Sequence, residues 1–414
     1  MKKRFQKVIS VLLCCLFVFG SLAPGVKAES DELQREVERY NYVIGTNAFA
    51  PGYQFTDADP LSEVADQIWA WGSNMIKFSA GNNDGLVDRI LEEHDFDYVF
   101  MWYRSNAYFK DGYSEAEARA DYDAFYGLTQ KLLKKYNETG KEFFLGHWEG
   151  DWYYIDDYNK GQEKVDDTVT EGMIAWINTR QKAVDDAKRD TPHKDVSVWN
   201  YLELNRPTDA MKKGYDRVVN RVLPFTNVDY VSYSAYDSKN SSKRSLKRVI
   251  DYIYENLPEK SGVPGPRVFI GEVAEPASQF DFNDRRHCNA NLRIMSKYLQ
   301  CDVRFFLYWE MYCNETLPDG RSSGYWLIDD NGNKTLLYKK LQTLLRDGKE
   351  YVEKYAKKNG RVPSDSEYRS FLLRHPVIVK ARIGVFFEDI IDLFRSAFVK
   401  QNETVFDQNE RKTK

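Results

Sequence analysis

Two glutamates occupy equivalent positions in this chain, each at the end of a short apolar run. Glu149 follows the letters L-G-H-W, and Glu272 follows V-F-I-G. Runs of this kind are typical of buried parallel strands, and each is followed by a loop and then a helical pattern. Cleavage of a glycosidic bond needs two carboxyl groups, one to protonate the departing oxygen and one to act on the anomeric carbon or on a water. The pair predicts this chemistry if the fold brings the two side chains together.

The rest of the chain alternates strand patterns with helical patterns. Eight strands are predicted, at residues 42–46, 75–79, 98–103, 142–147, 196–201, 230–234, 268–271 and 303–308. Eight amphipathic helices alternate with them, at residues 61–71, 86–93, 114–136, 169–188, 210–222, 242–256, 289–299 and 336–357. This pattern is typical of an α/β fold of the (β/α)8 (TIM) barrel type, because right-handed crossovers leave few other ways to connect parallel strands. A doubly wound open sheet is the alternative, but the first strand lacks its usual Gly-x-Gly-x-x-Gly turn.

The two ends of the chain have different compositions from the barrel pattern. Residues 1–28 combine a basic start, an apolar run and a small-residue end, which predicts a cleaved signal peptide and a secreted or periplasmic protein. Residues 40–358 form the predicted barrel. Residues 359–414 form a predicted C-terminal helical extension, which is too charged between 377 and 399 to span lipid and ends in a polar tail.

The charge of the chain bears on its partners. Removal of the five basic residues of the signal segment from the 59 Lys and Arg leaves 54 against 63 Asp and Glu, a net charge of about −9. This charge disfavours nucleic acid or an anionic membrane as partner, so a neutral carbohydrate fits better.

The cysteines and histidines predict little further chemistry. Cys288, Cys301 and Cys313 remain after processing. An odd number allows at most one disulfide, and we expect either a bridge between Cys288 and Cys313 or three reduced thiols. None of the five histidines is paired at a metal-binding spacing, so we expect no metal and no cofactor.

In the predicted barrel Glu149 closes strand four and Glu272 closes strand seven. In this respect the chain resembles the clan of retaining (β/α)8 glycoside hydrolases, in which the acid/base follows strand four and the nucleophile follows strand seven. The resemblance implies that Tyr236, after strand six, contacts the nucleophile. It also implies that Trp309, after strand eight, forms an aromatic floor under the sugar.

The resemblance has one departure, in the residue before the acid/base. The clan normally has an asparagine there that hydrogen-bonds the sugar 2-hydroxyl, and this chain has Trp148. We expect His147 or Asn200 to supply the missing donor.

The two glutamates need different environments for this chemistry. Burial beside Trp148 and Trp152 and the charge of Glu272 are expected to raise the pKa of Glu149, so that it can act as the acid. Tyr236, with Arg104 or Lys77, is expected to keep Glu272 ionised.

Other acidic and aromatic residues compete for roles in the site. Asp151 is the rival acid/base, whereas Glu203 and Glu310 are predicted to contact the substrate or support the site. Trp102, like the other tryptophans at strand ends, suits the flat face of a sugar ring.

The sequence therefore predicts a secreted retaining glycoside hydrolase. The alternative is a barrel that binds carbohydrate without cutting it, since fold does not dictate activity. A hydrolase of another bond has little support, because no Gly-x-Ser-x-Gly or His-Glu-x-x-His motif is present.

Overall fold

A closed barrel of eight parallel strands forms the centre of the computed structural model, which describes residues 24–104 and 108–383. The strands follow one another in chain order, and β1 pairs with β8 to close the barrel. They are β1 (Ile44–Ala48), β2 (Met75–Gly81), β3 (Tyr98–Tyr103), β4 (Glu142–Gly146), β5 (Ser197–Leu204), β6 (Tyr230–Ser234), β7 (Val268–Val273) and β8 (Phe306–Tyr308). The predicted (β/α)8 barrel is confirmed.

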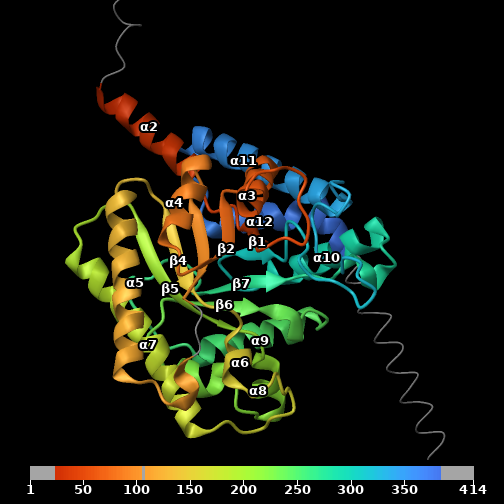
Figure 1. The fold of residues 1–414 in the computed structure, drawn as a ribbon. Coiled ribbons are helices and arrows are strands. Elements are labelled where there is room, and N and C mark those ends of the chain that lie inside the picture. Colours follow the sequence, from red (N-terminus) through yellow and green to blue (C-terminus); the bar gives the residue numbers. More distant parts are fainter. Residues whose placement is uncertain (1–23, 105–107, 384–414) are drawn as a thin grey trace, which may run out of the picture.

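Helices surround the barrel and cover the outer faces of the strands (Figure 1). The α-helices are α2 (Pro24–Glu38), α3 (Pro60–Trp71), α4 (Asp84–Glu93), α5 (Glu115–Lys135), α6 (Gly150–Tyr154), α7 (Asp167–Asp190), α8 (Pro207–Lys213), α9 (Lys243–Asn256), α10 (Asp284–Tyr298), α11 (Leu336–Asn359) and α12 (Asp365–Arg374). Short helical turns of other types are η1 (Tyr108–Asp111), η2 (Val218–Val222), η3 (Leu223–Phe225), η4 (Ala235–Asp237) and η5 (Ala277–Phe280).

Two apolar layers hold this arrangement together. The larger layer fills the space between the strands and the helices. The strands are buried along almost their whole length. The smaller layer fills the barrel interior with aromatic rings, among which Phe100 and Phe144 stack at 4.4 Å between centroids. The barrel is thus a packed core, and a site is left to the ends of its strands.

One predicted helix differs from the observed structure. Residues 210–222 were expected to be continuous, but α8 ends at Lys213 and η2 begins at Val218. Gly214 adopts a left-handed conformation with φ of 70°, which ends the helix and turns the chain. The segment after β5 therefore contains two short helical elements and not one continuous helix.

The terminal predictions are covered only in part. Residues 1–23 lie outside the described residues, and α2 runs across the expected cleavage point at residue 28. At the other end α12 and a helical stretch at 376–383 confirm a helical C-terminal region, while residues 384–414 lie outside the described residues. No helix in the described part of the chain is both long and apolar enough to cross a membrane.

Candidate active site

A cleft of about 720 Å³ opens at the carboxyl ends of the strands, and both predicted glutamates lie in it. Residues from the loops after most of the strands contribute to its walls. The lining residues are Phe49, Trp102, Trp148, Glu149, Trp152, Lys160, Asn205, Arg206, Tyr236, Asp237, Glu272, Trp309, Asn314, Glu315 and Tyr325.

Glu149 is the residue immediately before α6, three positions beyond the end of β4. One carboxylate oxygen accepts a hydrogen bond from the hydroxyl of Ser234, and the other accepts one from Trp152 Nε1 at 2.5 Å. Ser234 ends β6, so Glu149 is tied to a strand two places away in the barrel. The side chain is therefore held at a fixed position in the cleft.

Glu272 lies in β7, directly beside Ser234 of β6 in the strand register. Ser234 thus contacts one glutamate through its hydroxyl and neighbours the other through the sheet. Glu272 receives a hydrogen bond from Tyr236, while its Oε2 has no partner within the described residues. A buried carboxylate oxygen without a partner is free to meet a ligand atom.

A buried ion pair lies beneath the two glutamates. Glu203 Oε2 is 2.7 Å from Lys77 Nζ and accepts a hydrogen bond from Ser232 at 2.6 Å. Lys77 also donates to the carbonyl oxygen of Gly271, the residue before Glu272, at 3.1 Å. Both charged side chains are fully buried. Glu203 therefore supports the site from below and does not line the cleft.

Burial raises the pKa of both cleft glutamates. The pKa of Glu149 rises to about 7, chiefly through loss of solvent, although the bond from Ser234 opposes the rise and the charge of Glu203 adds to it. The pKa of Glu272 is raised well above its ordinary value by burial and then by the charge of Glu149, against the opposing charge of Lys77. The two carboxyls repel each other's charge, so ionisation of one disfavours ionisation of the other.

Burial raises the pKa of both glutamates, whereas the sequence analysis predicted a raised pKa for Glu149 alone. We expected Glu149 alone to be protonated and Glu272 to stay ionised. Glu149 accepts two hydrogen bonds that favour its ionised form, whereas the effect of burial on the pKa of Glu272 is opposed by the charge of Lys77 and the hydrogen bond from Tyr236. The raised pKa therefore belongs to the pair and does not by itself distinguish acid from nucleophile.

Aromatic rings form two walls of the cleft. Phe49 lies between Trp102 and Trp309, with ring centroids 3.9 and 5.2 Å away. On the other side, Trp148 and Trp152 follow β4, and the Trp152 indole binds Glu149. Both walls are flat apolar surfaces of the kind that suits the faces of sugar rings.

Two of the predicted substrate donors do not line the cleft. His147 is buried against Trp176 of α7 at 4.9 Å between ring centroids, and burial lowers its pKa to about 3. Asn200 lies in the middle of β5, in register with Leu145, because β5 continues to Leu204 and not only to residue 201 as predicted. Each residue of strand advances about 3.3 Å, so Asn200 is well below the mouth of the barrel.

Arg104 and Glu310 are also absent from the lining. The carbonyl oxygen of Arg104 accepts a hydrogen bond from Arg180, and Lys77 is the cation whose charge acts on Glu272. Glu310, joined to Trp309 by a cis peptide bond, is fully buried and accepts the backbone amide of Asn314 at 3.1 Å.

The rival acid Asp151 has a structural position. It is fully buried, and its carboxylate accepts hydrogen bonds from the backbone amides of Asn205, Arg206 and Val218 at 2.8–2.9 Å. These bonds fix the loop after β5 to the loop after β4.

The sequence interpretation missed about half of the lining. Phe49, Asn205, Arg206 and Asp237 follow β1, β5 and β6 within three residues, so the rule that found Glu149 would have found them as well. Lys160, Asn314, Glu315 and Tyr325 lie on long loops, where no local pattern indicates which way the chain turns.

Of the two alternatives for the cysteines, the structure contradicts the Cys288–Cys313 bridge and agrees with three reduced thiols. Cys288, Cys301 and Cys313 are all unbridged and buried. Cys288 lies within α10, and the sulfur of Cys313 contacts Ser323 and the carbonyl oxygen of Glu315. Within residues 24–104 and 108–383, no three His, Cys, Asp or Glu side chains are grouped so as to hold a metal ion.

A scan against protein-family models and a search of curated proteins gave no match for the chain. Solved structures do match. A GH5_18 protein from Bifidobacterium longum subsp. infantis aligns with TM-score 0.50 and 13% identity, over 73% of this chain and 78% of that one. A family 39 glycoside hydrolase from Bacteroides cellulosilyticus WH2 aligns with TM-score 0.47 and 12% identity, over 75% and 64%. A GH5-4 broad specificity endoglucanase from Ruminococcus champanellensis aligns with TM-score 0.43 and 14% identity, over 71% and 86%.

At 13% identity the likeness to the GH5_18 protein shows the fold alone. The predicted resemblance to the (β/α)8 glycoside hydrolase clan is confirmed at that level, and no single family is indicated.

Proposed function

We propose that the protein is a glycoside hydrolase that cleaves O-glycosidic bonds with retention of configuration, with Glu149 as acid/base and Glu272 as nucleophile. The observation that carries the proposal is the meeting of two buried carboxyls, from β4 and β7, in one aromatic cleft. Glycosidic cleavage needs two such groups and an apolar surface that binds the sugar.

In the first step Glu272 attacks the anomeric carbon while the proton of Glu149 passes to the departing oxygen. In the second step Glu149 takes a proton from water, which displaces Glu272 from the sugar. The transition state carries positive charge on the sugar ring, which favours the ionised form of Glu272. The charge of Lys77 and the bond from Tyr236 support that form, and the raised pKa of Glu149 keeps the proton that the leaving group needs.

A panel of aryl glycosides tests the proposal directly. The purified protein is expected to release the phenol from at least one member of the panel. Glu272→Gln is expected to abolish this release, and Glu149→Gln to slow it most where the phenol is a poor leaving group. Glu171→Gln, which changes an exposed glutamate of α7, serves as the control. NMR of the first-formed sugar is expected to show the same anomer as the substrate. The opposite anomer would overturn the retaining mechanism and leave the hydrolase assignment intact.

The alternative function is carbohydrate binding without cleavage. It is favoured by one departure from the clan, the presence of Trp148 in place of the asparagine before the acid/base. Glycan binding by a protein that releases no phenol from any substrate would support this alternative.

We also propose that the protein is exported, on the basis of the signal-like segment at 1–28. Expression with this segment in a bacterial host is expected to give a product that begins at Glu29. Mass spectrometry of the exported and cell-retained fractions checks the mature mass.

A further inference from the structure

The cleft carries a cationic side on the wall that holds Glu149. The Trp152 indole binds the Glu149 carboxylate, so this ring lies beside the group that would protonate the leaving sugar. Lys160 Nζ is 5.6 Å and Arg206 Cζ is 5.8 Å from the centroid of Trp152, and all three side chains line the cleft. A sugar stacked on Trp152 would place its substituents near two positive charges.

Lys160 is the cation available to a ligand. It is exposed, and it forms no ion pair with any residue in the described part of the chain. Its backbone is nevertheless fixed, because the buried Arg217 donates to the carbonyl oxygen of Lys160 at 2.9 Å and to that of Gln162 at 2.8 Å. The loop that presents this amine is therefore anchored from below.

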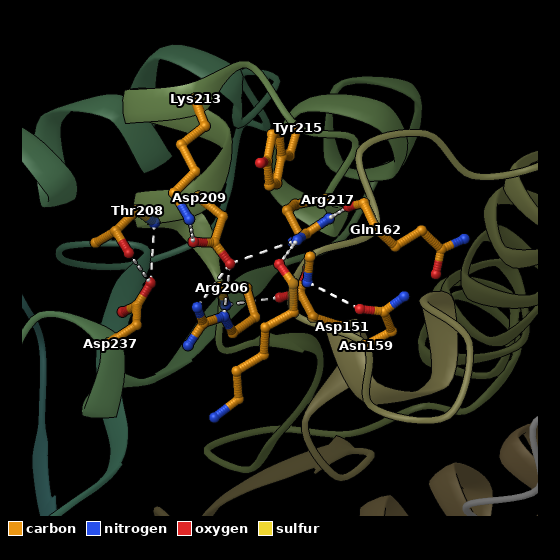
Figure 2. A network of polar contacts seen from close by, with 12 residues as sticks. Asp151, Asn159, Gln162, Arg206, Thr208, Asp209, Lys213, Tyr215, Arg217 and Asp237 are labelled. Carbon is orange, nitrogen blue, oxygen red and sulfur yellow. Dashed lines mark hydrogen bonds and ion pairs between the residues drawn. The ribbon is translucent and has the colours of Figure 1, made fainter.

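Arg206 is held by a carboxylate that it shares with other cations. Its Nε donates to Asp209 at 2.8 Å, and Lys213 and Arg217 approach the same carboxylate at 3.6 and 3.5 Å (Figure 2). Asp209 is thus shared among three cations, so it does not neutralise Arg206 alone. Asp237, another carboxylate that lines the cleft, accepts hydrogen bonds from Thr208 and Tyr233, and its charge also acts on Arg206. Lys160 is therefore the cation on which the argument depends.

We infer that the substrate carries an anionic substituent, a uronate carboxylate or a sulfate ester, on the leaving-group side of the scissile bond. Lys160 binds this group, Arg206 adds to the local field, and Trp152 stacks against the sugar that bears it. The inference rests on the proposed function, and it replaces the neutral glycan expected from the net charge of the chain. Charge acts locally here, because interactions beyond about 8–10 Å are screened at physiological ionic strength.

The test compares glycans that differ only in charge. Suitable pairs are polygalacturonate with its methyl ester, glucuronoxylan with its carboxyl-reduced form, and carrageenan with its desulfated form. Reducing-sugar release and affinity electrophoresis are measured for the native protein, for Lys160→Gln and for Lys212→Gln. Lys212 is an exposed lysine of α8 that does not line the cleft, so its variant is the matched control.

The native protein is expected to prefer the anionic member of at least one pair. Lys160→Gln is expected to lower the anionic-to-neutral ratio of kcat/KM by about fivefold or more, and Lys212→Gln to leave it in place. The preference is also expected to weaken as NaCl is raised. The uronate and sulfate pairs then distinguish the two anions.

Two outcomes would overturn the inference. Cleavage of neutral glycans alone, or an equal loss on both members of a pair in Lys160→Gln, would remove the anionic subsite while the hydrolase assignment stands. If no glycan is cut, affinity electrophoresis still shows whether the cleft binds anionic glycans through Lys160. Retardation by anionic glycans that Lys160→Gln relieves would support the subsite without the activity, and no retardation would overturn both.

Discussion

The carboxylate of Glu203 accepts a hydrogen bond from the backbone amide of Glu149 at 3.1 Å. The other oxygen of Glu203 forms the buried ion pair with Lys77, which in turn binds the carbonyl before Glu272. One ion pair thus holds the backbone at both catalytic candidates. Glu203 acts on the reaction through their positions and not by contact with substrate.

Removal of one partner of this ion pair is expected to destabilise the protein strongly. Glu203→Gln and Lys77→Met each leave a buried charge uncompensated, at a cost of about 3–5 kcal/mol. Thermal unfolding followed by circular dichroism checks the loss. The double variant is expected to recover much of the stability and to lack activity. Equal stability of all three variants would contradict the coupling.

The two catalytic candidates are expected to respond differently to the leaving group. Glu149→Gln removes the proton donor, so kcat should fall by about 10²–10⁴ on poor leaving groups and much less on activated phenols, which depart without help. Glu272→Gln should be inactive on all of them, because the attacking group is lost. A Brønsted series of aryl glycosides measures the difference. The reverse result would exchange the two roles.

The stability of the protein is expected to depend on pH through Glu149. Its pKa is about 7 in the folded protein and about 4.5 in an unfolded chain. The unfolded state therefore loses this proton first, and the contribution to stability, roughly 3 kcal/mol at most, is present below pH 4.5 and lost as pH rises through 7. Glutamine does not titrate. The Tm of Glu149→Gln relative to the native protein should hence be higher at pH 8 than at pH 4.5, and a pH-independent difference would contradict the raised pKa.

The hydrogen bond from Trp152 is expected to set the alkaline limb of activity. It lowers the pKa of Glu149, so Trp152→Phe, which keeps a ring and removes the donor, should shift that limb to higher pH. Profiles of kcat/KM against pH measure the shift. Trp148→Phe is the control, since Trp148 lines the cleft without a bond to Glu149, and an equal shift in both variants would count against this role.

Two glycine-to-alanine substitutions are expected to change the stability of the protein in opposite directions. A Cβ on Gly146, at the end of β4, would lie 2.2 Å from the Tyr201 ring inside the barrel. Gly146→Ala should cost about 1–3 kcal/mol because the core is overpacked. Gly127, on the exposed face of α5, has no atom within 4 Å of its Cβ position, so Gly127→Ala should stabilise the helix by about 0.5–1 kcal/mol. Thermal unfolding of the pair checks both.

Much of the fold could be predicted because each barrel strand is recognisable from the residues of its own short segment. Strands buried on both faces are continuous apolar runs, and all eight were found. Asn200 was wrongly expected near the mouth of the barrel because β5 was predicted to end at residue 201, whereas it continues to Leu204. The last residues of β5, Leu202 to Leu204, include Glu203, whose charge is balanced by Lys77 from a strand 126 residues earlier in the chain. A local pattern cannot show that a charged residue is buried with such a partner.

The sequence alone determined that Glu149 and Glu272 lie at the ends of parallel strands, since hydrophobic periodicity is a property of neighbouring residues. Only the tertiary structure decided the rest. It turned His147 toward a helix, brought Lys160 to the cleft from a long loop, and raised the pKa of both glutamates by burying them. Each of these depends on burial and on charges far apart in the chain, which exist only once the barrel has closed.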